Sequence, residues 1–163
     1  MPPPTDALLR VTMLNAAYAA AIDADRLEEW PGFFIEDCHY RITTAENHRR
    51  GLQAGVVYAE GRAMLQDRVF ALRKANIYER QSYRHIVGLP TILGGDAQGD
   101  GAPLRAEAPF VVVRTMRDGT MEVFAAGRYL DALQDDGDGA LRFAERLVVC
   151  DSPNFDTLLA IPL

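Results

Sequence analysis

The hydrophobic positions at the start of the chain repeat every three to four residues. One stripe collects the apolar side chains Leu8, Val11, Leu14, Tyr18 and Ile22. Because this is the spacing of one helical face, residues 6–23 are predicted to form a helix that Thr5 or Asp6 can cap.

A second, short helix and an aromatic cluster are expected next. Asp25 is followed three residues later by Glu28, a capping pattern that predicts a helix ending before Pro31. The aromatic residues of this stretch are Trp30, Phe33 and Phe34. We interpret them as a plug of the hydrophobic core.

The middle of the chain switches between extended and helical patterns. β-Branched and aromatic content predicts a strand over residues 38–43, and the polar stretch 46–55 is expected to be an exposed connection. Residues 58–76 return to helical spacing and predict a second long helix. Its inward side chains are expected to be Met64, Leu65, Val69 and Leu72.

From residue 82 onward the pattern is that of strands. Four strand-like segments follow without a helical pattern between them, at residues 83–93, 106–116, 121–133 and 140–150. Asp118-Gly119 predicts a two-residue type I′ hairpin, and residues 135–139 are expected to close the next hairpin. Helices first and antiparallel strands afterwards indicate an α+β fold.

The predicted strands are long, at about 11 residues against a usual 5–6, so the sheet must twist and curl. A strongly curved antiparallel sheet around N-terminal helices is the cone-shaped fold called NTF2-like or cystatin-like. In two of the strands, Phe110 and Val112 oppose Val111 and Val113, and Phe124 and Leu130 oppose Val123 and Tyr129. We therefore expect one face to cover the helices and a partner subunit to cover part of the other.

Composition narrows the functional classes. The chain has 163 residues, is 48% hydrophobic and carries a net charge of −6, so we expect one domain over residues 1–163 and no nucleic-acid partner. The N-terminus lacks the basic and apolar regions of a signal peptide, and no window is apolar enough to span a membrane. The two cysteines, Cys38 and Cys150, are expected to be free thiols in the cytoplasm.

The residues alone do not define an active site. A pocket inside the cone could transfer protons with one or more of the side chains Asp23, His39, Tyr40, Tyr83 and His85. A metal centre is not indicated by spacing, since no two of the three histidines are four residues apart, and the Cys and His pairs of a Rieske cluster are missing.

Several segments together resemble the small, or β, subunits of aromatic-ring-hydroxylating dioxygenases. The first runs from Asp25 through Trp30-Pro31-Gly32-Phe33-Phe34 to Asp37-Cys38-His39-Tyr40-Arg41. The others are Met64 to Tyr78, and Tyr83-Arg84-His85-Ile86-Val87-Gly88. Within the family, Asn47-His48, Ala75 to Arg80 and the segments Cys150-Asp151-Ser152 and Asp156 to Leu163 look most like the terephthalate branch, and the anthranilate and salicylate types stay open.

The resemblance implies a structural, non-catalytic subunit with no cofactor of its own. In such enzymes the large (α) subunit holds a Rieske [2Fe–2S] cluster and a mononuclear Fe(II), an NADH-dependent reductase supplies electrons, and the ring is converted to a cis-dihydrodiol. The implied assembly is an α3β3 heterohexamer. No catalytic or metal-binding residue carries over, and the interface residues predicted for this chain are Tyr78, Tyr83 and Arg84.

Two other hypotheses remain at this stage. One is a free-standing isomerase or dehydratase of the same fold that uses His85 with Asp23 or Tyr40. The other is a module that binds aromatic acids without a metal.

Overall fold

A seven-stranded sheet organises the described part of the chain. The computed structural model describes residues 4–53, 55–75, 81–98, 102–154 and 161–163. Its elements, in chain order, are α1 (Pro4–Asp23), the 3₁₀ helix η1 (Leu27–Phe33), β1 (Phe34–Thr44), α2 (Ala45–Arg49), β2 (Val57–Glu60), α3 (Arg62–Lys74), β3 (Gln81–Val87), β4 (Thr91–Gly94), β5 (Leu104–Met116), β6 (Met121–Asp135) and β7 (Leu141–Cys150).

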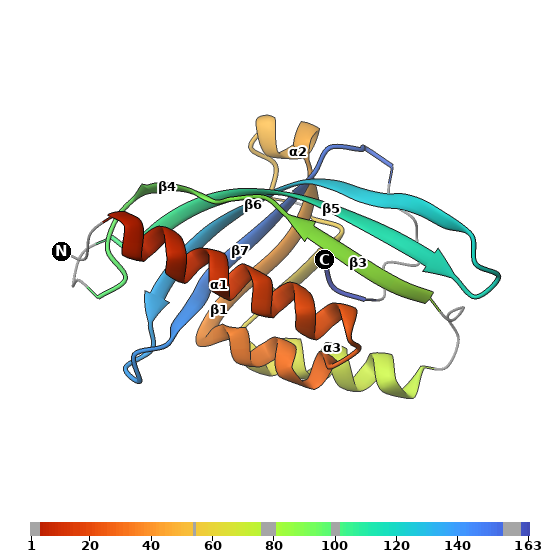
Figure 1. The fold of residues 1–163 in the computed structure, drawn as a ribbon, viewed down its shortest axis with the longest axis horizontal. Helices are drawn as coiled ribbons and strands as arrows, with labels where there is room; N and C mark the ends of the chain where they lie inside the picture. Colours follow the sequence, from red (N-terminus) through yellow and green to blue (C-terminus); the bar gives the residue numbers. More distant parts are fainter. Residues whose placement is uncertain (1–3, 54, 76–80, 99–101, 155–160) are drawn as a thin grey trace.

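The strands follow the order β2-β1-β7-β6-β5-β3, and β4 also pairs with β5. Neighbouring strands are antiparallel except β1 and β7, which run parallel. The long strands β5, β6 and β7 curve over α1 and α3, whereas α2 lies on the opposite side of the sheet (Figure 1). The predicted α+β architecture, with N-terminal helices on a strongly curved sheet, is confirmed, but the expected antiparallel pairing does not hold between β1 and β7.

The aromatic cluster forms the core plug that the sequence predicts. Trp30 and Phe34 are fully buried and meet edge to face with ring centroids 5.9 Å apart. Phe33 is half-buried and packs edge to face on Tyr18 of α1 at 5.7 Å. These rings join the first helix to the start of β1.

The second long helix begins four residues later than predicted. Residues 57–60 form the short strand β2, in which buried Val57 and Ala59 alternate with exposed side chains. Gly61, at φ +86°, separates this strand from α3. The prediction that Met64 points inward is wrong, because the stripe buried by α3 consists of Leu65, Val69 and Leu72.

The predicted capping role of Asp25 is also wrong. Asp25 lies in the left-handed region at φ 59°, and η1 begins after Arg26 with no side-chain cap. The helix continues through Pro31 because a 3₁₀ helix accepts the φ that proline requires and loses only one hydrogen bond there. The Asp25 carboxylate instead accepts hydrogen bonds from Arg73 of α3 at 2.9 and 3.0 Å.

The β5–β6 hairpin forms where predicted, with a different turn. Gly119 donates to the Met116 carbonyl at 2.9 Å and has φ +88°, whereas Asp118 does not have a positive φ. A type I′ turn needs two such residues, so this is a three-residue loop with glycine at the bulge position. In the next hairpin, Asp135 accepts from the backbone N–H groups of Gly137 and Gly139, which confirms residues 135–139 as the connection.

Two other segments differ from the prediction in detail. Residues 83–93 are not one strand, because β3 ends at Val87 and β4 starts at Thr91, with Pro90 buried between them. The predicted exposed connection 46–55 includes four of the five residues of helix α2. The Thr44 side chain caps this helix by accepting from the Asn47 N–H at 3.1 Å.

A bulge in β6 changes which side chains share a face. Val112 pairs with Ala125 and Val113 with Val123, which leaves Phe124 without a partner in the ladder. Phe124 therefore turns inward against the core, as Tyr129 does. The sequence prediction placed Phe124 and Tyr129 on opposite faces, since strict alternation takes no account of a bulge.

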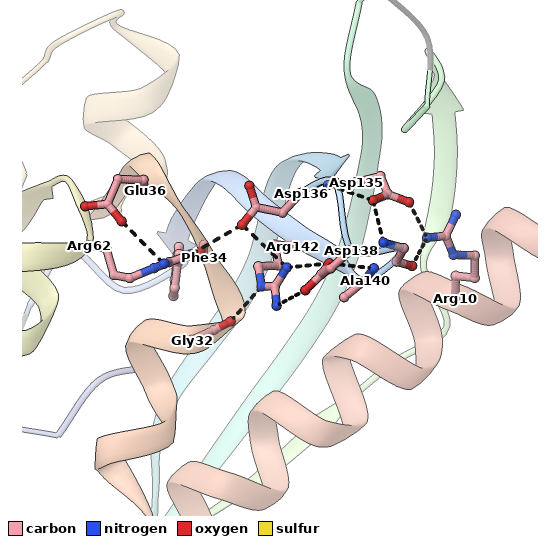
Figure 2. A network of polar contacts seen from close by, with 12 residues as sticks. Arg10, Gly32, Phe34, Glu36, Arg62, Asp135, Asp136, Asp138, Ala140 and Arg142 are labelled. Carbon is pink, nitrogen blue, oxygen red and sulfur yellow. Dashed lines mark hydrogen bonds and ion pairs between the residues drawn. The ribbon is translucent and has the colours of Figure 1, made fainter.

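Arginines on three elements fix the β6–β7 hairpin to the helices (Figure 2). Arg10 of α1 lies 3.8 Å from the Asp135 carboxylate, and Arg62 of α3 lies 3.5 Å from Asp136. Arg142 of β7 pairs with Asp138 at 2.8 Å, and this contact lowers the pKa of Asp138 to about 2. The hairpin is thereby held against α1 and α3.

Candidate functional site

His85 and Asp23 form a buried pair between β3 and the end of α1. Alternation along β3 turns His85 to the helix side of the sheet, and α1 ends with Asp23. The Asp23 carboxylate accepts from the His85 backbone N–H at 2.8 Å and lies 2.6 Å from the ring Nδ1. The side chains are 0% and 6% exposed. Because a carboxylate can only accept, Nδ1 carries the proton and Nε2 is left to face other groups.

A cleft of about 350 Å³ lies beside this pair. Its lining comes from one side of α1 and from the edge strand β3 and the residue after it, namely Thr12, Asn15, Ala16, Ala19, Ala20, Asp23, Arg84, His85, Val87 and Gly88. The alanines keep the helix side of the cleft open. Both His85 and Asn15 have a buried side-chain nitrogen, Nε2 and Nδ2, without a hydrogen-bond partner among the described residues.

The interior of the cone is filled by aromatic rings and the last residues of the chain. Tyr18 and Tyr40 donate to the main-chain oxygen of Leu163 at 2.7 and 3.0 Å, and Leu163 is fully buried. Trp30 donates to the Tyr18 hydroxyl at 3.1 Å. Burial raises the pKa of Tyr40 well above its ordinary value. Of the two partners considered for His85, Asp23 therefore contacts it in the structure, whereas the Tyr40 hydroxyl is hydrogen-bonded to Leu163.

A buried ion pair lies deeper in the sheet, and the sequence analysis missed it. Arg146 of β7 donates from Nε and Nη2 to Asp131 of β6 at 2.9 and 2.8 Å, and from Nη2 to Asn15 at 2.6 Å. Its guanidinium lies 3.8 Å from the centroid of Tyr129 and 3.9 Å from that of Phe143. Although burial opposes it, the charge of Asp131 raises the pKa of Arg146. Charged residues at inward positions of two apolar strands were the signal available in the sequence.

The face of the sheet opposite α1 and α3 carries an apolar band, which we define as Ile86, Val111, Val113 and Val123. The register places Ile86 beside Val111, and Val113 beside both Arg84 and Val123. Ile86 is 60% exposed and Val123 69%. This band is the apolar second face that the sequence predicts.

The three predicted interface residues lie in different surroundings. Arg84 is exposed next to the apolar band. Tyr83 is buried in this chain, with its ring 5.2 Å from Phe124. Tyr78 lies outside the described residues.

The described residues contain no group of three His, Cys, Asp or Glu side chains arranged to hold a metal ion. Both cysteines are buried, and burial raises the pKa of Cys38 and that of Cys150, the latter to about 12. An iron–sulfur cluster takes four cysteine ligands, or two cysteines and two histidines in a Rieske centre, and the described residues bring no such set together. No helix in the described part of the chain is long and apolar enough to cross a membrane.

Comparison with known proteins gives matches along nearly the whole chain. The family model described as "Ring hydroxylating beta subunit" matches residues 17–156. The β1 subunit of the terminal oxygenase component of terephthalate 1,2-dioxygenase from Comamonas sp. is 52% identical over 155 residues, covering 95% of this chain and 97% of the relative. The small subunit of anthranilate 1,2-dioxygenase from Burkholderia cepacia is 42% identical, covering 94% and 92%.

A solved structure agrees with these relatives. The crystal structure of a candidate β subunit of an aromatic-ring-hydroxylating dioxygenase from Novosphingobium aromaticivorans superposes with a TM-score of 0.86. It is 39% identical to this chain, and the match covers 98% of both chains. The curved sheet and its helices are thus the architecture of such a subunit.

Proposed function

The chain belongs to the family of ring-hydroxylating β subunits, and from this premise we propose that it is the non-catalytic small subunit of a dioxygenase that cis-dihydroxylates terephthalate. The choice of terephthalate rests on sequence identity, which is higher to the terephthalate relatives than to the anthranilate relative. Both substrates are aromatic carboxylates. The proposal therefore assigns the substrate class first and terephthalate within it.

A β subunit implies a large α partner, and we propose that this partner carries the redox centres. These are a Rieske [2Fe–2S] cluster and a mononuclear Fe(II), which an NADH-dependent reductase supplies with electrons. Support comes from the donor set of this chain, whose two cysteines are fewer than the four ligands that an iron–sulfur cluster takes. We further propose that the complex contains three large and three small chains and lies in the cytoplasm. Residues 1–163 of this chain are proposed to form one domain.

The contact with the partner is proposed for the face of the sheet that bears the apolar band. Ile86 and Val123 are exposed to solvent on either side of β5, beside Val111 and Val113 respectively. An exposed apolar surface of this kind suits burial by another subunit. Arg84 adds a polar contact at the edge of the band. Tyr78 and Tyr83 remain predicted interface residues, of which Tyr83 would act from beneath the surface through its packing on Phe124.

Reconstitution tests this function. Large subunit and reductase are assayed for NADH-dependent O₂ uptake with terephthalate, anthranilate and benzoate, with and without this chain. We expect terephthalate to be the preferred substrate and activity to require both subunits, with no turnover by this chain alone. Dehydration or isomerisation of a cyclic substrate by the isolated chain would contradict the proposal. Preference for anthranilate would contradict only the choice of terephthalate.

A further inference from the structure

β3 is an edge strand, and its free side borders the cleft next to α1. It pairs with β5 on one side, and no described strand pairs with the other. The His85 backbone N–H donates to Asp23 of α1, so the main-chain groups of His85 point away from β5. Because this direction alternates along an antiparallel strand, the main-chain groups of Val87 point the same way. The next residue agrees, since the Gly88 N–H donates to Pro109 of β5 at 2.9 Å.

Part of this free edge is open. Asp23 occupies the His85 N–H, which leaves the His85 carbonyl and both the N–H and the carbonyl of Val87. These groups form no hydrogen bond with the described residues. His85 and Val87 both line the cleft of about 350 Å³. An edge that presents unpaired donors and acceptors is a template for a further strand.

The helix side of the cleft limits what can lie along this edge. Ala16, Ala19 and Ala20 of α1 present only methyl groups to the cleft. Another extended backbone carries donors and acceptors at the spacing of β3, and small side chains on it would fit beside the alanines. The occupant that matches both features is an extended peptide segment.

The outer face of β3 indicates the side chains of that segment. Arg84 and Ile86 are exposed there, and Arg84 forms no ion pair with the described residues. Cross-strand neighbours share a face, so an acidic residue beside Arg84 and an apolar one beside Ile86 would complement them. A second copy of this chain suits the edge less well, because its β3 carries the same Arg84 and a His85 N–H already bonded to Asp23.

We propose that an extended segment of the large subunit adds to the edge of β3, between β3 and α1. Its backbone donates to the carbonyls of His85 and Val87 and accepts from the Val87 N–H. Small residues face the alanines of α1, and an acidic residue lies beside Arg84. The inference rests on the proposed function, since a β subunit implies a large partner. It places a main-chain contact next to the apolar band, because Ile86 belongs to the same strand.

The Val87 amide reports the added strand directly. The tagged chain is co-expressed with the large subunit, and hydrogen exchange at single amides is measured in the complex and in the isolated chain. We expect the Val87 N–H to be unprotected in the isolated chain and to exchange at least about tenfold more slowly in the complex. The His85 N–H is the internal reference, because its bond to Asp23 protects it in both states.

A backbone variant tests whether the contact is made by main-chain groups. Val87→Pro removes the outward N–H and leaves the bonds to β5 in place, since proline is accepted on the free side of an edge strand. The apparent dissociation constant of the complex should rise by about tenfold or more. Val87→Ala keeps the N–H and is the matched control, with an expected change of no more than about twofold.

A second pair of variants blocks the cleft from the helix side and keeps the test decisive if Val87→Pro does not fold. Ala20 lies in the lining at an exposed position, so Ala20→Leu should also weaken the complex by about tenfold or more. Ala17 is exposed on the same helix but outside the lining, and Ala17→Leu should change the dissociation constant by no more than about twofold. Thermal melting followed by circular dichroism checks that each variant is folded.

The outcomes separate this inference from the proposed function. Unchanged exchange of the Val87 amide in an intact complex, or full binding by Ala20→Leu, would overturn the inference and leave the proposed function standing. Failure of the wild-type chain to bind the large subunit would contradict both. Protection of Val87 in the isolated chain that increases with its concentration would show a second copy at the edge, which would also refute the inference.

Discussion

Replacing Arg146 by methionine tests the buried ion pair that joins β6 to β7. The Arg146 and Asp131 side chains are 0% and 1% exposed and share two hydrogen bonds. Methionine keeps most of the volume and removes the charge. The change therefore leaves the Asp131 carboxylate without its counter-ion and deprives Asn15 of its donor.

The magnitude follows from this geometry. Breaking a buried pair by removing one partner destabilises a protein by about 3–5 kcal/mol, whereas replacing both partners by apolar residues is often neutral. We therefore expect Arg146→Met to lower the free energy of unfolding by about 3–5 kcal/mol. The double variant Arg146→Met/Asp131→Leu should regain most of that loss, because no unpaired charge stays in the core.

Urea denaturation is a suitable assay, since Trp30 is the chain's one tryptophan and lies in the core. The single variant Asp131→Leu completes the double-mutant cycle. It is also expected to be destabilising, because it leaves the buried charge of Arg146 without a counter-ion. A loss below about 1 kcal/mol for Arg146→Met, or a double variant as unstable as the sum of the two single ones, would refute the reasoning.

Three further predictions concern the helices and the sheet. Arg73 lowers the pKa of Glu28 to about 2 from 4.5, so the stabilisation from this contact is present above pH 4.5 and declines as the pH falls toward 2. The Tm difference between wild type and Glu28→Gln should therefore be constant above about pH 5 and shrink below it, and a difference that grows in acid would contradict the pairing. Gly127→Ala would place a Cβ 1.9 Å from the Val149 carbonyl oxygen and should destabilise the fold by at least about 2 kcal/mol. Gly32→Ala is the control, because its Cβ would meet nothing within 4 Å, and it should not destabilise the fold. Equal stabilities of the two variants would show that β6 and β7 are further apart. Trp30→Ala should lose roughly 3–5 kcal/mol in denaturation followed by circular dichroism, and a normally stable variant would place Trp30 outside the core.

The order and type of the long elements could be predicted from periodicity alone. The stripe of α1, the two hairpins and the aromatic plug each depend on residues close in sequence. The strand β2 was missed because four alternating residues directly before a helix are too few to separate from its pattern. The face of Phe124 was wrong because a bulge depends on pairing with β5, which is not encoded in the local alternation of β6.

The candidate site was only partly predictable for a related reason. The sequence left Asp23 and Tyr40 open as partners of His85, because the contact between His85 and Asp23 joins residues 62 positions apart and requires the docking of α1 against β3. Asn15 was not considered, since its role arises from Arg146 across 131 positions. Contacts at such separations follow from the tertiary fold, which residue patterns specify only through the elements.

The central claim is that this chain is a metal-free subunit built to assemble with a larger, iron-containing one. Its most direct test is to co-express the tagged chain with the large subunit, purify the complex through the tag, and measure mass and iron content by subunit. The account predicts a particle of about 200 kDa, as three copies of each chain would give, with all the iron in the large subunit. An iron-free particle composed of this chain alone, with the large subunit left behind, would contradict it.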